Sequence, residues 1–98
     1  MARVIYSAAA LDDLERIVAF LLEKSSAQSA ALALAQVRKA IDILASHPRI
    51  GRRVRAQLRE LVISHGASGY LALYRFDAAL DVVAVLRIRH QREAGYRD

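Results

Sequence analysis

The apolar positions between residues 8 and 46 recur with a helical period. They predict one helix that begins after Ser7, a suitable N-cap, and ends near Lys24, and a second that begins at Ser25 and ends at residues 46–48. Spacings of three and four place each apolar stripe on one helix face. Small alanines in the second helix would allow close approach, so we predict an antiparallel helical hairpin. The stripes are Leu11, Leu14, Val18, Leu21 and Leu22, then Ala30, Leu34, Val37, Ile41 and Leu44.

The flanking segments have strand patterns. Residues 2–6 are β-prone, residues 58–64 partly alternate, and residues 70–76 and 82–88 are almost continuously apolar. Strands that are apolar on both faces are usually central and covered, which the helical hairpin would achieve. The sequence therefore predicts one α+β domain, residues 1–98. It has an N-terminal strand, a two-helix antiparallel hairpin and a three-stranded antiparallel sheet, in the order β-α-α-β-β-β.

Composition narrows the class of protein. The 98 residues suffice for one core, and 15 Lys and Arg against 10 Asp and Glu give a net charge of +5. All but two of these cations are arginine, which favours contact with phosphate or carboxylate groups. The expected partner is therefore nucleic acid or an acidic protein.

Several absences bear on location and chemistry. The chain has no cysteine, no apolar run of the ~20 residues that span a bilayer, and no secretory signal pattern at its start. We expect a cytoplasmic protein that does not enter the membrane. No spacing typical of metal ligands, a nucleotide loop or a nucleophile elbow occurs, so no metal or other cofactor is expected.

Basic residues gather in two stretches. A connector after the second helix would contact phosphate or an acidic surface, or simply keep a loop soluble, and it contains Arg49, Arg52, Arg53, Arg55 and Arg59. The end of the last strand supplies a second group, Arg87, Arg89, His90 and Arg92. Within the apolar 70–76 strand, Arg75 is expected to form an ion pair with Asp77, Asp81 or Glu60.

The second basic stretch contains candidates for RNA cleavage. Attack by a 2′-OH needs a proton acceptor, a cation at the phosphorane and a proton donor. Those roles could fall to Arg87, Arg89, His90 and Tyr96. Strand alternation, however, places the two arginines on one side and His90 on the other, so a solvated basic strand end is the alternative.

Several local patterns, taken in order, resemble the RelE/ParE toxin superfamily of type II toxin–antitoxin modules. An S-x-x-A-x-x-D-L pattern opens the first helix at Ser7, and P-x-x-G-R follows the second helix at Pro48. Tyr74-Arg75 resembles the "Y-R" of the third core strand, and residues 87–90 resemble the "R-x-x-H" of the fourth. The similarity extends over essentially the whole chain.

The resemblance implies a growth-arresting, plasmid-stabilising toxin that a cognate antitoxin neutralises, in a possible hetero-oligomer. ParE-like members poison DNA gyrase by binding, with no catalytic residue, and RelE-like members cut mRNA on the ribosome. The two junction patterns are closer to ParE, and both lysines lie on predicted helices rather than on a RelE-like active surface. The expected function is therefore gyrase inhibition, with Arg49, Arg52, Arg53, Arg55, Arg59 and Arg92 as target- or partner-binding residues. A RelE-like endoribonuclease, using the four candidates named above, and a non-toxic antitoxin-binding module are the alternatives.

Overall fold

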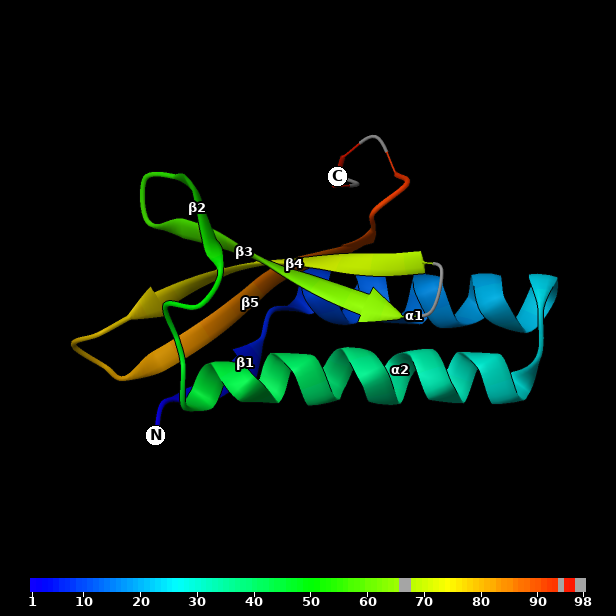
Figure 1. The fold of residues 1–98 in the computed structure, drawn as a ribbon, viewed down its shortest axis with the longest axis horizontal. Helices are drawn as coiled ribbons and strands as arrows, with labels where there is room; N and C mark the ends of the chain where they lie inside the picture. Colours follow the sequence, from blue (N-terminus) through cyan, green and yellow to red (C-terminus); the bar gives the residue numbers. More distant parts are fainter. Residues whose placement is uncertain (66–67, 94, 97–98) are drawn as a thin grey trace.

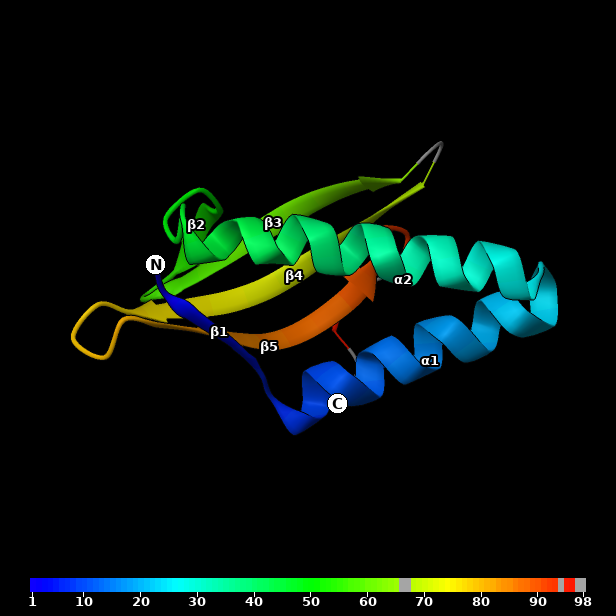
Figure 2. The ribbon, with the colours of Figure 1, turned by 90° about the horizontal axis from the view of Figure 1, so that it is seen from below.

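In the computed structural model, a five-stranded sheet carries two helices on one face (Figures 1 and 2). The model describes residues 1–65, 68–93 and 95–96. The elements in chain order are β1 (Arg3–Tyr6), α1 (Ala8–Lys24), α2 (Ala27–Asp42), the 3-10 helix η1 (Ile43–Ala45), β2 (Arg52–Arg55), β3 (Leu58–His65), β4 (Ser68–Asp77) and β5 (Val82–His90).

The α+β prediction is confirmed, but the sheet has five strands rather than three. The strand order is β1-β5-β4-β3-β2, with β1 parallel to β5 and the other pairs antiparallel. Two strands account for the difference: the N-terminal β1 joins the sheet beside β5, and β2 comes from the basic connector and pairs with β3. All four β2 residues are exposed, so the strand has no apolar alternation to reveal it. An edge strand held through its backbone tolerates such a charged sequence.

Serines begin both helices, but the second prediction was off by one residue. Ser7 Oγ accepts a hydrogen bond from the N–H of Ala10 (3.0 Å), as predicted. The second helix is capped by Ser26, whose Oγ accepts from the N–H of Ser29 (3.0 Å). Ser25 is not the cap because its own N–H donates to the carbonyl of Leu21 (2.8 Å), which completes the last turn of α1.

The core lies between the helical hairpin and the sheet. Its largest fully buried side chains come from α2, η1 and the three central strands: Tyr74, Ile41, Leu44, Ile63, Ile88, Val37, Val83 and Val85. Among residues 1–65, 68–93 and 95–96, no helix is long and apolar enough to cross a membrane.

A β-bulge near the middle of β5 sets the direction of the residues after it. Leu73 pairs with Arg87 while Tyr74 pairs with Val85, so Leu86 is an extra residue in β5. Val85 before the bulge and Ile88 after it are both buried in the core. Arg89 is therefore directed to the opposite face, which we call the open face.

Candidate functional site

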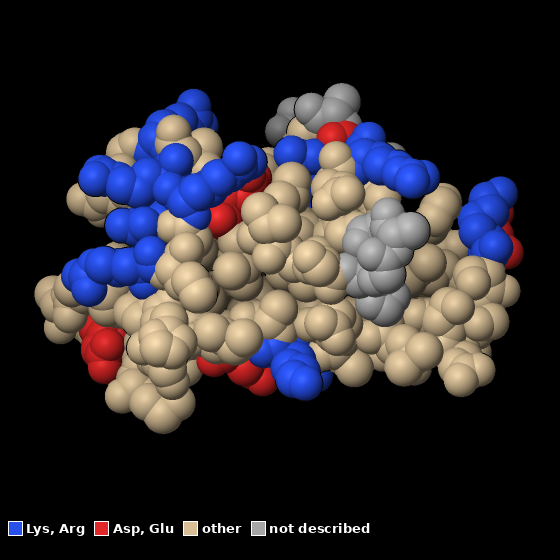
Figure 3. Space-filling model, viewed as in Figure 1, with Lys and Arg blue, Asp and Glu red and all other residues tan. Residues whose placement is uncertain are grey.

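The basic connector folds into a hairpin. We call residues 49–59, with β2 and the start of β3, the arginine hairpin; its turn lies at Ala56 and Gln57, and Ala56 takes a left-handed φ of 48°. Figure 3 shows Lys and Arg side chains gathered at this end of the molecule, over β2 and β3. Of the six predicted target-binding residues, Arg59 is half-buried and the other five are exposed, but Arg92 lies apart, after β5.

Three of the arginines fix the base of the hairpin. Arg52 forms an ion pair with Glu60, with Nε 3.1 Å from Oε1. Arg59 Nη1 donates to the carbonyls of Arg49 (3.1 Å) and Gly51 (2.8 Å). The Arg49 guanidinium lies 4.9 Å from the centre of the Phe76 ring. These contacts hold the connector against the sheet.

The remaining cations of this region, Arg53, Arg55 and Arg75, have no acidic partner among the described residues. Arg53 and Arg55 are exposed and form no ion pair or side-chain hydrogen bond with the described residues. Arg75 was predicted to form an ion pair, and that prediction was wrong for the described part of the chain. The reason is its position. Arg75 in β4 pairs with Leu58 in β3 on an exposed part of the sheet, where water solvates the charge of the guanidinium.

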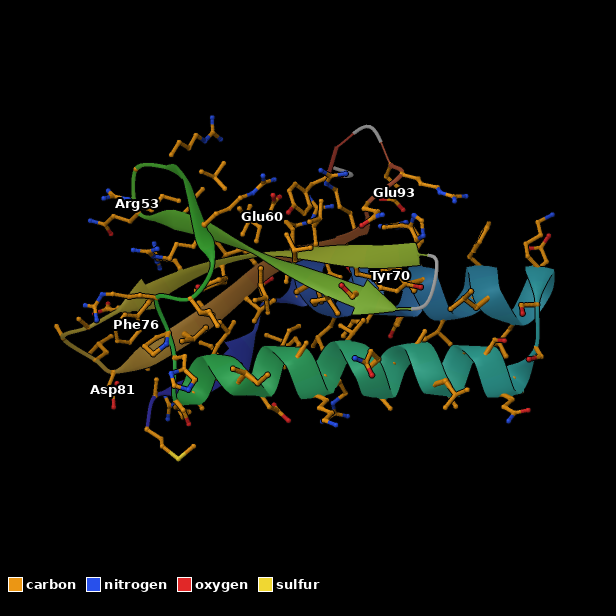
Figure 4. All side chains as sticks on the ribbon, viewed as in Figure 1. Arg53, Glu60, Tyr70, Phe76, Asp81 and Glu93 are labelled. Atoms are coloured by element: carbon orange, nitrogen blue, oxygen red, sulfur yellow. The ribbon has the colours of Figure 1, made fainter. Side chains whose placement is uncertain are left out.

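Glu60 and Tyr96 form a cluster over the open face that the sequence did not reveal. The Tyr96 hydroxyl donates to Glu60 Oε2 (2.6 Å), and the Arg89 guanidinium lies 5.1 Å from the centre of the Tyr96 ring. Arg89 also donates to the carbonyl of Glu93 (2.6 Å). Figure 4 shows Glu60 and Glu93 on the side of the sheet away from α2. Glu93 and Tyr96 are thereby attached to the sheet.

The same contacts set the protonation of this cluster. Burial, followed by the hydrogen bond to Glu60, raises the pKa of Tyr96 above its ordinary value, so the phenol keeps its proton. Burial opposes ionisation of Glu60, but hydrogen bonds from Tyr96 and Arg52 outweigh it, and the pKa of this carboxyl is lowered. At neutral pH the cluster therefore contains a carboxylate and a protonated phenol.

Arg87 is engaged elsewhere. Asp13 in α1 accepts hydrogen bonds from Arg87 Nε (2.9 Å) and Nη2 (3.2 Å), and from the backbone N–H of Ile88 (2.7 Å). Arg16, one turn further along α1, pairs with Glu93. Arg87 thus contributes to the attachment of α1 to β5.

His90 lies on the helix side of the sheet, as alternation predicts. Its ring meets the buried Tyr70 edge-on, with ring centres 5.3 Å apart and planes at 89°. Its Nδ1 accepts a hydrogen bond from the N–H of Arg92 (3.1 Å). A groove of about 640 Å³ passes this point between α1 and the end of β5. The four candidate catalytic residues thus occupy three environments, and the side-chain contact between Arg89 and Tyr96 joins two of them on the open face.

Replacing Glu60 with glutamine is expected to cost about 1–3 kcal/mol of stability at pH 7, because the ionised acceptor of three hydrogen bonds, two from Arg52 and one from Tyr96, is lost. The lowered pKa makes this contribution complete above 4.5, the ordinary value, and it is lost as the pH falls through the lower folded-state pKa. Urea denaturation at pH 7 and about pH 3 should show the wild-type advantage shrinking. Glu23→Gln, at an exposed position, is the control; an equal difference at both pH values would contradict the assignment.

The architecture is that of a small α+β domain with a basic hairpin at one end of its sheet. A family model described as "ParE toxin of type II toxin-antitoxin system, parDE" matches residues 4–95. The chain is 36% identical over 81 residues to Toxin RelE3 of Caulobacter vibrioides, covering 83% of this chain and 85% of that protein. The chain belongs to the ParE toxin family, within the RelE/ParE superfamily of type II toxin–antitoxin systems.

Solved structures share the fold. The chromosomal ParDE system of P. aeruginosa matches with a TM-score of 0.78 and 18% identity, over 92% of this chain and 96% of that one. The E. coli RelBE toxin–antitoxin complex matches with a TM-score of 0.63 and 17% identity, over 95% of this chain and 100% of that one. The resemblance inferred from the sequence is therefore confirmed at the level of the superfamily.

Proposed function

We propose that the chain is a ParE-like toxin that inhibits DNA gyrase by binding it, and that a cognate antitoxin neutralises it. The observation that carries the proposal is the separation of the candidate catalytic residues. Cleavage of RNA needs a proton acceptor and cations at one phosphate. Here Arg87 binds Asp13, the phenol of Tyr96 is a protonated donor to Glu60, and His90 packs on Tyr70 on the helix side.

The target-binding surface in this proposal is the arginine hairpin, with Arg92 outside it. Binding requires only an exposed, correctly shaped surface, and the hairpin provides one with exposed cations at Arg53 and Arg55. Growth arrest and stabilisation of a plasmid that carries the module would follow from gyrase inhibition.

This chain has a groove between α1 and the end of β5 that is suitable for binding the antitoxin. Ile17, Phe20, Leu21 and Tyr70 give this groove apolar walls, and its polar rim contains His90, Arg92 and the ion pair between Arg16 and Glu93. An amphipathic segment with acidic residues would fit both. The P. aeruginosa ParDE and E. coli RelBE structures, which are toxin–antitoxin systems, support a partner of this kind.

A RelE-like endoribonuclease acting on ribosome-bound mRNA is the second candidate. The contact between Arg89 and Tyr96 on the open face favours it, because a cation and a phenol there could meet one phosphate. The similarity to Toxin RelE3 points the same way. In this alternative Tyr96 would have to move, because its hydroxyl donates a hydrogen bond to Glu60.

The deciding experiment is induced expression of the chain in a bacterium, with separate pulse-labelling of DNA and of protein synthesis. A supercoiling assay with the purified chain and gyrase follows. We expect DNA synthesis to stop first. We expect His90→Ala and Tyr96→Phe to change gyrase inhibition less than about tenfold, a binding difference of about 1.4 kcal/mol. Wild-type chain with gyrase omitted serves as the assay control.

An early stop in translation would overturn the gyrase proposal. In that case the same two variants should lower mRNA cleavage by about 10²–10⁴-fold, as expected for groups that transfer protons. Normal synthesis of both polymers would instead indicate an antitoxin-binding module without toxicity.

A further inference from the structure

We propose that the arginine hairpin binds the phosphate backbone of double-stranded DNA. The toxin would then contact the DNA segment held by gyrase as well as the enzyme, and this gyrase part of the inference rests on the proposed function. DNA binding itself does not depend on it.

The whole charge excess of the chain lies around this hairpin. Residues 43–76 contain six arginines and a single acid, Glu60, a net charge of +5 that equals that of the entire chain. The remaining nine cations are matched by nine acids. Glu60 is moreover already bound by Arg52 and Tyr96, so it adds little negative potential to the surface. Such a concentrated field attracts a polyanion.

The free cations are arranged across adjacent strands. Arg55 pairs with Leu58, and Leu58 pairs with Arg75, so the two arginines stand in one cross-strand row. Two inter-strand spacings separate their backbones by about 10 Å. Arg53 pairs with Arg59, the residue after Leu58 in β3, so it is directed to the other face of the hairpin and adds a cation there. Long guanidinium side chains at this spacing can reach successive phosphates of one duplex.

The shape of the hairpin favours a duplex over a peptide. The hairpin is a two-stranded ribbon at the edge of the sheet, and it projects beyond the neighbouring strands (Figure 1). The major groove of B-DNA admits a two-stranded ribbon, and the turn residues Ala56 and Gln57 are uncharged and exposed. An acidic amphipathic peptide needs a groove with apolar walls, which this chain offers beside α1 instead.

The test is fluorescence anisotropy of a labelled duplex of about 20 bp and arbitrary sequence, with full-length chain made by cell-free synthesis to avoid toxicity. We expect a Kd of about 10⁻⁴–10⁻⁶ M at physiological salt, with log affinity falling linearly with log salt. The triple variant Arg53→Ala/Arg55→Ala/Arg75→Ala should weaken binding at least about tenfold and reduce the salt slope by about 2–3.

Matched variants separate a local surface from general charge. Lys24→Ala/Arg38→Ala/Lys39→Ala removes the same charge from exposed helix positions and should retain most of the affinity. Arg53→Lys/Arg55→Lys/Arg75→Lys keeps the cations and should retain binding, which excludes misfolding as the cause. Equal losses in the two alanine triples would overturn the inference. So would tighter binding to single-stranded RNA of equal length, or full displacement of DNA by poly-glutamate of equal charge.

The two proposals fail in different ways. Absence of DNA binding by wild-type chain overturns this inference and leaves gyrase inhibition standing. DNA binding without gyrase inhibition overturns the proposed function alone. If both hold, the alanine triple at the hairpin should also weaken inhibition of supercoiling, and the helix triple should not.

Discussion

Replacing Asp13 with alanine is expected to lower the free energy of unfolding by about 3 kcal/mol or more. The Asp13 carboxylate is 4% exposed and accepts hydrogen bonds from Arg87 and from the backbone N–H of Ile88. The substitution removes the carboxylate from a half-buried guanidinium and leaves the Ile88 N–H without its acceptor, and both changes carry a desolvation cost. Urea denaturation followed by circular dichroism measures the loss.

The neighbouring residue provides the control. Asp12 is exposed and forms no hydrogen bond or ion pair with the described residues, so Asp12→Ala should change stability by less than about 0.5 kcal/mol. In an Arg87→Met background the cost of Asp13→Ala should be smaller, with a coupling of about 1–3 kcal/mol. Similar losses for the two aspartates would contradict the role given to Asp13.

Asp13 is important because the pairing of β1 with β5 ends close to this residue. β1 pairs with β5 only as far as Tyr6 and Val85, after which the chain turns into α1. Ser7 continues the attachment, since its N–H donates to the carbonyl of Val85 (2.9 Å) and its Oγ to that of Leu86 (2.8 Å). Further along β5, the Asp13 carboxylate accepts the hydrogen bond from the N–H of Ile88 that the carbonyl of a neighbouring strand would otherwise accept.

This geometry gives a physical reason for the S-x-x-A-x-x-D-L pattern. Ser7 caps α1, Ala10 is fully buried, Asp13 binds β5, and Leu14 packs in the core. The residues of the pattern prove to be those that join the first helix to the last strand, so they report the fold rather than an activity.

Local chemistry predicted the elements well. The helical period located both helices, although Leu11 and Leu22 of the first predicted stripe are exposed. The continuous apolar runs located β4 and β5 within one or two residues at their starts and ends. These features depend on neighbours three or four positions apart, or on simple burial. Tyr70 and Tyr74 on β4 are both buried in the core.

Long-range pairing escaped prediction. Nothing in Arg52-Arg53-Val54-Arg55 distinguishes an edge strand from a loop, because its strand character comes from the backbone of β3. The partner of Arg87 lies 74 positions earlier, and the partner of Tyr96 lies 36 positions earlier. Arg87, Arg89 and His90 lie close together in the sequence and therefore suggested a common site. In the structure, the β-bulge and the acidic partners Asp13 and Glu60 place the candidate residues in different environments.

Replacing Gly51 with alanine is expected to destabilise the fold by about 2–4 kcal/mol and to weaken DNA binding by the arginine hairpin. A Cβ at Gly51 would lie 2.6 Å from both Cε1 and the hydroxyl of Tyr74, and 3.0 Å from the carbonyl of Glu60. The Tyr74 ring is fully buried and has no room to move. Its hydroxyl also accepts a hydrogen bond from the Gly51 N–H (2.8 Å), which the displaced backbone would lose.

Gly95→Ala is the matched control, because a Cβ there would meet no atom within 4 Å, and it should alter the unfolding midpoint little. Tyr74→Phe isolates the hydrogen bond and should cost about 1–3 kcal/mol. Adding Gly51→Ala to Tyr74→Phe should then cost less than Gly51→Ala alone, since one of the two contacts at 2.6 Å is gone. A Gly51→Ala protein as stable as wild type would show that the connector is not fixed through Tyr74. The hairpin would then owe its position to the contacts of Arg49, Arg52 and Arg59 with Phe76, Glu60 and the connector carbonyls.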